Sequence, residues 1–253
     1  MARLRSYARR GGLNGFVLTR ALEEYARRRP SRIVSNRWLQ QRFGGEIVYH
    51  VRDASVLDPA GTPESLPARL DPALVWVGFI GTPRFHKGIH VLLQAVVEAR
   101  RHANVGLVVM GCSEGEPFVL SARAALGAAF EGLPAFPWSE LRDHVRLPDI
   151  IAVPSLDVPA AWGQIPAKLF DAMAMAKPII ASALNDMPEI LSGVGVTVPP
   201  GDQQKLADAI VGLARDAGRR AQLGAAAREK LIRLYSYDAG RRVLTRAVAA
   251  AAR

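Results

Sequence analysis

The sequence contains a single cysteine, Cys112, and no long apolar run. One thiol excludes an internal disulfide, and cysteine-poor chains are typical of reducing compartments. No stretch reaches the roughly 18 consecutive apolar residues of a membrane-spanning helix. The first residues are rich in arginine and are interrupted by Gly11 and Gly12, so they lack the apolar centre of a secretory signal. We therefore expect a cytoplasmic protein.

Familiar nucleotide-binding motifs are also absent. Neither G-x-G-x-x-G, the dinucleotide pattern, nor G-x-x-x-x-G-K-[ST], the phosphate loop of ATPases, occurs in the chain. Hydride transfer with a nicotinamide cofactor and ATP hydrolysis therefore lose their main support. Any nucleotide site must be built from other residues.

Acidic residues are fewer than basic ones, and the formal net charge is +10. Residues 1–45 hold eleven arginines and two glutamates, so nearly all of the excess lies there. We favour a solvated basic helix, and peripheral contact with a membrane is the alternative, because anionic headgroups attract such clusters by about 1 kcal/mol per charge. Interleaved aromatic residues and a nucleic-acid reader motif are missing, so we do not expect nucleic acid as a partner.

Composition divides the chain into four segments. Residues 1–58 are predicted to form a helix (18–29), a short helix that Ser35 caps and Gly44 ends, and a strand (46–51). Residues 59–72 are rich in proline and small polar residues, as in a linker. Residues 73–235 form the main domain, and residues 236–253 form a carboxyl-terminal helix that follows an interruption near Ser236.

The main domain alternates short apolar runs with segments of helical period. Strands are expected at 74–80, 105–110, 149–153 and 178–181, and helices begin near residues 89, 166 and 202. Runs that are apolar throughout are typical of parallel strands buried on both faces. The pattern predicts an α/β fold, a three-layer α/β/α Rossmann-like domain with a mostly parallel sheet.

Two stretches carry residues suited to bind a nucleotide. The first is the turn from Gly81 to Gly88, where Arg84 and Lys87 follow a predicted strand. Ligands of parallel sheets bind at the carboxyl ends of strands, and two positive charges there suit a diphosphate. The alternative is two solvated basic side chains at a helix start, where positive charge is slightly unfavourable.

The second stretch runs from Trp162 into a helix that Pro166 opens. Lys168 and Asp171 are three residues apart and so share a helix face. An acid there can accept hydrogen bonds from ribose hydroxyls, and the loop amides can face phosphate. The alternative is a plain ion pair between the two side chains, which the spacing alone slightly favours.

As an ordered set, these segments resemble the carboxyl-terminal domain of the retaining GT-B glycosyltransferases of the group 1 or family four type. The matching segments are GFIGTPRFHKGIHVLLQA, PDIIAVPS, IPAKLFDAMAMAKPIIAS, MPEIL and VTVPPGDQQKLADAIVGLARD. They cover roughly residues 74 to 235. VSNRWLQQRFGG and VRDASVLDP resemble the passage between the two domains of that family.

The resemblance implies transfer of a sugar from a nucleotide-diphosphate donor to a hydroxyl acceptor, with retention of configuration. It implies no cofactor, no metal and no protein nucleophile, and the sequence has no Asp-x-Asp motif. His86 and His90 have a spacing seen in zinc sites, but no third ligand has a matching spacing, so no metal is expected.

The resemblance also assigns roles to individual residues. Arg84 and Lys87 would be catalytic, because they would bind the donor diphosphate and stabilise the departing nucleotide. Asp171 matches a family glutamate associated with the ribose, whereas Gly163 stands where the family has a glutamate near the donor sugar. The predicted donor-binding residues are Gly81, Thr82, Gly163, Gln164, Ile165, Lys168 and Asp171.

In this family the acceptor site belongs to an amino-terminal Rossmann domain, and 58 residues are too few to form one. We interpret residues 1–58 as a basic remnant of that domain with the interdomain passage. The expected acceptor is a glycan or a lipid-linked hydroxyl compound. The alternative function is a catalytically incomplete donor-binding module that needs a partner polypeptide to supply the acceptor domain.

Overall fold

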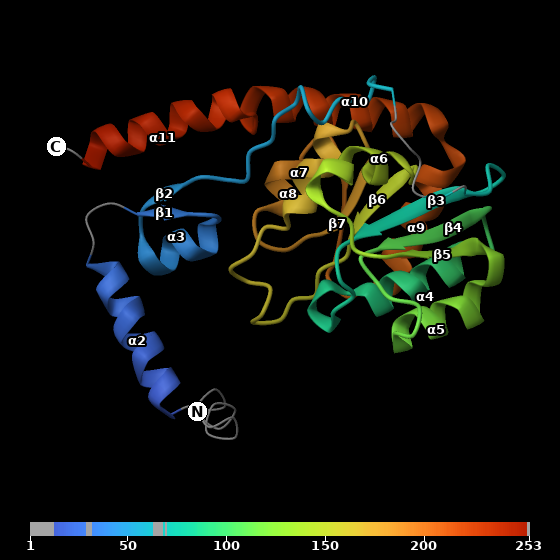
Figure 1. Cartoon of the computed structure of the whole chain (residues 1–253), viewed down its shortest axis with the longest axis horizontal. Helices are drawn as coiled ribbons and strands as arrows, with labels where there is room; N and C mark the ends of the chain where they lie inside the picture. Colours follow the sequence, from blue (N-terminus) through green and yellow to red (C-terminus); the bar gives the residue numbers. More distant parts are fainter. Residues whose placement is uncertain (1–12, 29–31, 63–67, 69, 252–253) are drawn as a thin grey trace.

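The computed structural model describes residues 13–28, 32–62, 68 and 70–251. Figure 1 shows a large α/β body, a long carboxyl-terminal helical arm above it, and a smaller amino-terminal part at its side. The predicted fold class is confirmed: the body has three layers, with helices on both faces of a parallel sheet.

All neighbouring strands of the six-stranded sheet are parallel, in the order β5-β4-β3-β6-β7-β8. The strands are β3 (Val75–Ile80), β4 (Val105–Met110), β5 (Phe130–Leu133), β6 (Ile150–Val153), β7 (Ile179–Ser182) and β8 (Val196–Val198). Four of them were predicted within a residue. The sequence analysis missed β5 and β8, the two edge strands, because each is short and only partly buried.

Two separate hydrophobic cores hold the layers together, one on each face of the sheet. Helices α4 (Ile89–Ala99), α5 (Pro117–Leu126) and α9 (Gln203–Arg215) cover one face. Helices α6 (Leu141–Arg146), α7 (Ala167–Ala174), α8 (Met187–Leu191) and α10 (Ala217–Leu234) cover the other. Neighbouring residues of β3 face opposite cores, with Val77 and Phe79 on the α4 side and Trp76 and Ile80 on the α7 side.

The amino-terminal part contains α2 (Leu13–Arg27) and a small unit in which β1 (Ile33–Val34), α3 (Arg37–Phe43) and β2 (Glu46–Ile47) follow one another. The prediction that Ser35 caps α3 is wrong. The side chain of Asn36 accepts from the Leu39 N–H at 2.9 Å, because the helix begins one residue later than expected. Gly44 ends α3 at φ 71°, as predicted.

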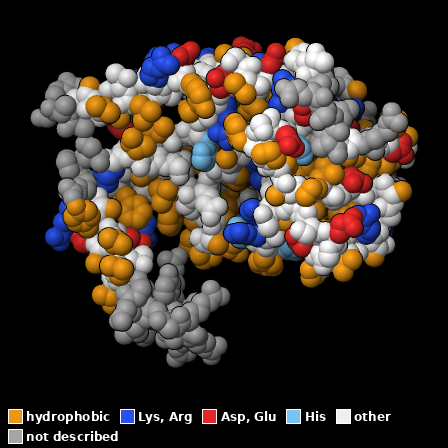
Figure 2. Space-filling model, in the orientation of Figure 1, with side chains coloured by type: hydrophobic (Ala, Val, Ile, Leu, Met, Phe, Trp, Pro, Cys, Tyr) orange, Lys and Arg blue, Asp and Glu red, His pale blue; other side chains and the backbone are white. Residues whose placement is uncertain are grey.

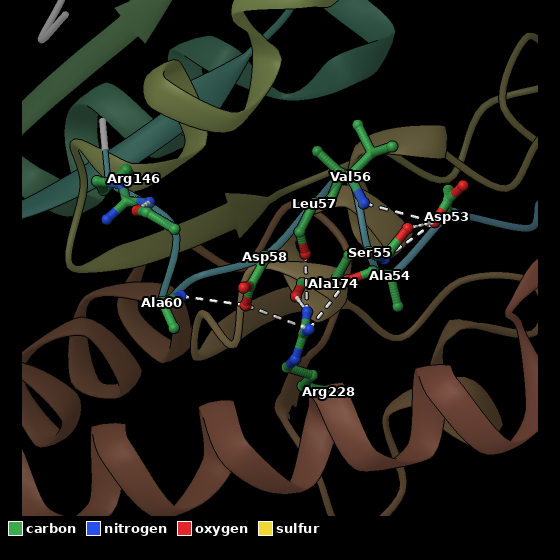
Figure 3. A network of polar contacts seen from close by, with 11 residues as sticks. Asp53, Ala54, Ser55, Val56, Leu57, Asp58, Ala60, Arg146, Ala174 and Arg228 are labelled. Carbon is green, nitrogen blue, oxygen red and sulfur yellow. Dashed lines mark hydrogen bonds and ion pairs between the residues drawn. The ribbon is translucent and has the colours of Figure 1, made fainter. Parts of the chain in front are cut away.

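The predicted strand 46–51 is also too long, because its partner β1 has two residues. Beyond β2 the chain crosses to the body as a strap, residues 48–58, which ends in a turn at 54–57 (Figure 1). Arg228 of α10 fixes the end of this strap by donating to the carbonyls of Leu57 at 2.7 Å and Ala54 at 3.0 Å (Figure 3). The strap is therefore bound to the body by specific contacts.

The helical arm breaks where predicted. Helix α10 ends at Leu234, and α11 (Tyr237–Ala251) follows it in nearly the same direction (Figure 1). At the break, Arg52 of the strap donates its N–H to the Tyr235 carbonyl at 2.9 Å and accepts from Tyr237 at 3.2 Å. Across the described ranges, every helix is too short or too polar to span a bilayer.

Candidate functional site

The candidate site lies where the sheet reverses its strand order. From β3 the chain builds outward to β5, and it then returns to place β6 on the other side of β3. The loops that follow β3 and β6 therefore diverge at the carboxyl edge of the sheet, which is where doubly wound folds bind ligands. Both stretches singled out in the sequence are these loops.

A cavity of about 280 Å³ lies between the two loops. Its polar lining comes from Lys87 and His86 of the first loop, from Ser155 and Gln164 after β6, from Lys168 on α7, and from Asn185 after β7. Its other walls are mostly apolar. None of the described residues that line it is acidic, so the cavity favours an anion.

One glycine allows the two loops to meet. Gly88 precedes α4 at φ 68°, and a Cβ atom there would lie 1.8 Å from the Pro154 carbonyl oxygen. Any side chain would force the loops apart, and a positive φ also strains other residues. The close approach of these loops therefore requires glycine at this position.

The ammonium groups of Lys87 and Lys168 converge above Gly81. A Cβ atom on Gly81 would lie 3.5 Å from Lys87 Nζ and 3.8 Å from Lys168 Nζ. Lys87 donates to the Thr82 carbonyl at 3.1 Å, and Lys168 Nζ lies 3.6 Å from the centre of the Phe79 ring. Two positive charges thus face one point of the cavity.

Burial and neighbouring positive charges lower the pKa values of both lysines. Burial, and then the charge of Lys87, lower the pKa of Lys168 to about 7, against the opposing effect of Asp171. The pKa of Lys87 is lowered by burial and then by Arg84. An anion that binds between the two groups would reverse these effects.

Arg84 is placed differently from Lys87. Its side chain is exposed, and it is not among the residues that line the cavity. It starts the 3-10 turn η1 (Phe85–Lys87), where its carbonyl accepts from the Lys87 N–H at 3.0 Å and its charge lowers the pKa of Lys87. Its predicted contact with a donor remains a prediction, at the rim of the site.

Asp171 also lies outside the cavity lining, on the side of α7 that faces the strap. Its buried carboxylate is paired with the guanidinium of Arg52, and not with Lys168 as the helical spacing had suggested. Burial raises the pKa of Asp171, and the hydrogen bond from Arg52 opposes that rise. Arg52 further donates to the Val51 carbonyl at 2.8 Å and to the Ala167 carbonyl at 3.3 Å.

The loop that holds Gly163, Gln164 and Ile165 is fixed from behind by the amino-terminal part. Gly163 lies against Trp38 and Leu39 of α3, and a Cβ there would be 3.5 Å from Leu39 Cδ2. Ile165 is buried, and its carbonyl lies 3.0 Å from His50 Nε2. Of the three residues, Gln164 alone lines the cavity.

Two buried polar side chains complete this support. Asn36 donates to the Trp162 carbonyl at 3.1 Å while it caps α3. Asp186, beside the cavity residue Asn185, accepts from the Tyr49 hydroxyl at 2.7 Å. Burial and this hydrogen bond raise the pKa of Tyr49.

The sequence analysis did not single out these supporting residues. Asn36 and Arg52 lie within VSNRWLQQRFGG and VRDASVLDP, the stretches that resemble an interdomain passage, so the sequence carried a signal for their region. It carried none for their contacts, which join residues more than a hundred positions apart.

The parallel sheet, the reversal of strand order and the cavity at its carboxyl edge are the features of doubly wound α/β proteins that bind ligands at this edge. Residues 71–216 match the family described as glycosyl transferases group 1. This match covers more than half of the chain, and the protein belongs to that family.

Individual relatives agree with this assignment. The chain is 34% identical over 158 residues to the D-inositol 3-phosphate glycosyltransferase of Xylanimonas cellulosilytica, a match that spans 59% of this chain and 36% of that enzyme. The structure of Anabaena Alr3699/HepE in complex with UDP-glucose superposes with a TM-score of 0.71 at 18% identity, covering 91% of this chain and 67% of that one.

A third comparison concerns the body alone. The carboxyl-terminal domain of LpcC, a glycosyl transferase group 1 protein of Francisella tularensis, superposes with a TM-score of 0.59 at 21% identity, covering 74% of this chain and 99% of that domain. The fold of the body is therefore that of a GT-B carboxyl-terminal domain, and the matched part spans about a third of the length of the Xylanimonas enzyme.

Proposed function

We propose that the chain binds a nucleotide-diphosphate sugar in this cavity and is the donor-binding part of a glycosyltransferase. The observation that carries the proposal is the convergence of Lys87 and Lys168 above Gly81, in a cavity whose described lining holds no carboxylate. Two fixed cations at the carboxyl end of a buried strand suit a diphosphate. Membership of the family supports transfer to a hydroxyl acceptor.

The positive charges also suit the step in which the nucleoside diphosphate leaves the sugar. When the bond between sugar and diphosphate breaks, negative charge develops on the leaving phosphate, and preorganised cations stabilise it. We propose that Lys87 supplies this stabilisation, with Arg84 adding a weaker field from the rim. A metal would then not be required, and retention of configuration is the outcome that the family resemblance implies.

The remaining lining suits the other parts of a donor. Gln164 and Asn185 present amide groups, and Asn185 already donates to the Ala161 carbonyl at 2.9 Å and the Gln164 carbonyl at 2.8 Å. Ala161, Leu184 and Met187 provide apolar wall. Anabaena Alr3699/HepE, which has the same fold, is described in complex with UDP and with UDP-glucose, which makes uridine diphosphates the first ligands to try.

The first experiment is calorimetric titration with UDP, GDP and ADP, followed by transfer and donor-hydrolysis assays with a panel of nucleotide sugars. Binding of one nucleoside diphosphate, with turnover of a matching sugar donor, is expected for an active enzyme. If nothing in the panel binds, the proposed function is wrong.

A second candidate is a donor-binding module that is inert without a partner polypeptide bearing the acceptor site. The observation in favour of this candidate is that the matched segment spans 36% of the length of the Xylanimonas enzyme. Measurable nucleotide binding without turnover of any donor would support the module. Transfer of sugar by the purified chain to a glycan or lipid-linked acceptor would exclude it.

Helix α2 supports a proposal of peripheral membrane contact through residues 1–45. Leu18, Leu22 and Tyr25 recur at helical spacing and are all exposed (Figure 2). Arg20 and Arg27 of this helix are balanced by Glu23 and Glu24, so the excess of arginine lies elsewhere in residues 1–45. A basic segment that carries an exposed apolar helix face binds anionic bilayers. Sedimentation with vesicles containing phosphatidylserine should capture the chain, with loss at high salt, and deletion of residues 1–45 should abolish capture. Equal capture by neutral vesicles would contradict the proposal.

A further inference from the structure

Lys168 is a half-buried cation in the cavity lining, and the described residues give it no ion-pair partner. Among the described residues, the contact recorded for its ammonium group is the face of the Phe79 ring, and no hydrogen bond or ion pair is formed. The nearest acid on its own helix, Asp171, is engaged by Arg52. An ammonium group has three donors, and here they are left for whatever enters the cavity.

Lys87 makes this arrangement more costly, because its ammonium group converges on the same point above Gly81. Two like charges in a partly buried site repel, and burial penalises each of them separately. A doubly charged anion between them would satisfy the free donors and cancel the repulsion. A diphosphate has both the charge and the oxygen atoms to do so.

We propose that Lys168 and Lys87 form a two-cation clamp for the diphosphate, and that Lys168 takes up a proton from solvent as the ligand binds. The inference rests on the proposed function and deepens it, because it makes Lys168 the second phosphate-binding cation of the site in place of Arg84. Lys168 would then couple donor affinity to pH.

The charged groups around Lys168 support this coupling. Lys87 and His86 face it from the first loop, Arg84 lies beyond them at the rim, and Asp171 lies on its own helix. Its pKa of about 7 leaves it partly neutral near neutral pH. A bound diphosphate favours the charged form, so binding and protonation reinforce each other. The affinity should therefore fall as the pH rises above neutrality.

The test uses the whole chain and inorganic pyrophosphate, which carries no sugar or base. Binding is measured by calorimetry near neutral pH in two buffers with different ionisation enthalpies, so that proton uptake appears as a difference in the observed heat. Lys168→Met should weaken pyrophosphate binding about 10- to 100-fold. It should also remove the proton uptake that the wild-type protein shows beyond that of the ligand itself.

Lys205→Met is the matched control, since Lys205 is an exposed lysine on α9 that is not among the residues lining the cavity. Its affinity and proton uptake should equal those of the wild type. Thermal unfolding of each variant establishes that it is folded, and proton uptake by the unmodified protein tests the proposal without any substitution.

Wild-type affinity in Lys168→Met, or no excess proton uptake by the wild type, would overturn the clamp. The proposed function fails separately. One outcome is that pyrophosphate binding depends on Lys168, while no nucleoside diphosphate or nucleotide sugar binds more tightly than pyrophosphate. In that case Lys87 and Lys168 form an anion site, and the proposed binding of a nucleotide-sugar donor is wrong.

Discussion

Two charged clusters border helix α7, and they differ in where their partners lie. On the strap side, Arg52 and Asp171 neutralise each other, and the guanidinium also donates to two carbonyls and lies over the Trp138 ring at 5.4 Å. On the cavity side, the ammonium groups of Lys87 and Lys168 face each other. Lys87 contacts the Thr82 carbonyl, and Lys168 contacts the Phe79 ring. The first cluster is complete within the protein, whereas the second requires an external anion.

This difference separates a structural use of charge from a binding use. A buried ion pair whose guanidinium also donates to two carbonyls fixes the elements that carry it, here the strap and the start of α7. A pair of like charges raises the energy of the folded chain unless a ligand compensates it. Removal of a charged group should therefore destabilise the fold on the strap side and weaken binding on the cavity side.

The largest expected effect is on the strap side. Arg52→Ala leaves the buried Asp171 carboxylate without its partner and should lower the free energy of unfolding by about 3–5 kcal/mol. Urea unfolding measures the loss. The double variant Arg52→Ala with Asp171→Ala should be more stable than Arg52→Ala alone, because no charge is then left unpaired. If Arg52→Ala costs less than about 1 kcal/mol, the scale of an exposed pair, the cluster is not structural.

The next effect lies on the cavity side and appears in binding. Lys87→Ala should weaken the binding of a nucleoside diphosphate by about 1.5–3 kcal/mol, the range for a hydrogen bond to a charged group, with little change in stability. Arg84→Ala is the comparison variant, and it should cost less than about 1 kcal/mol, because solvent screens its exposed side chain. Titration calorimetry that ranks Arg84 above Lys87 would reverse our assignment of the two residues.

The sequence predicted much of this site because its elements are local. The apolar run before Gly81 and the helical period after Gly88 identify a strand, a turn and a helix without knowledge of any distant residue. The same holds for the loop that leads into α7. Since parallel strands end at one edge of the sheet, the two loops had to lie near each other.

The partners of the charges could not be predicted in this way. Lys168 and Asp171 are three residues apart on one helix, which favoured an ion pair between them. The structure instead pairs Asp171 with Arg52, because the strap returns to α7 through contacts that no periodicity records. Sequence spacing thus predicted which residues gather at the carboxyl edge of the sheet, whereas burial and long-range packing decide which of them remain available to a ligand.

A smaller effect is expected for Lys168, where a substitution should stabilise the fold instead of destabilising it. The pKa of Lys168 is about 7 in the folded chain against an ordinary value of 10.5, so the unfolded state binds more protons between these values. The destabilisation by Lys168 is complete below about pH 7 and disappears as the pH approaches 10.5. Lys168→Met should therefore raise the melting temperature at neutral pH by about 2–4 °C, roughly 1 kcal/mol for a domain of this size. The gain should vanish at high pH, and a gain that is independent of pH would point to packing instead.

The smallest expected change in stability concerns Gly163, in the loop that leads into α7. Gly163 has a negative φ, and a Cβ atom there would meet Leu39 and Trp38 at 3.5 Å or more, which is ordinary contact. Gly163→Ala should therefore stabilise the fold by about half a kcal/mol, because alanine restricts the unfolded chain. Gly88→Ala is the control with the opposite sign, since its Cβ would lie 1.8 Å from the Pro154 carbonyl. A destabilised Gly163→Ala, measured by urea unfolding, would mean that the loop does not rest against α3 as described, and that the amino-terminal part does not support the cavity from behind.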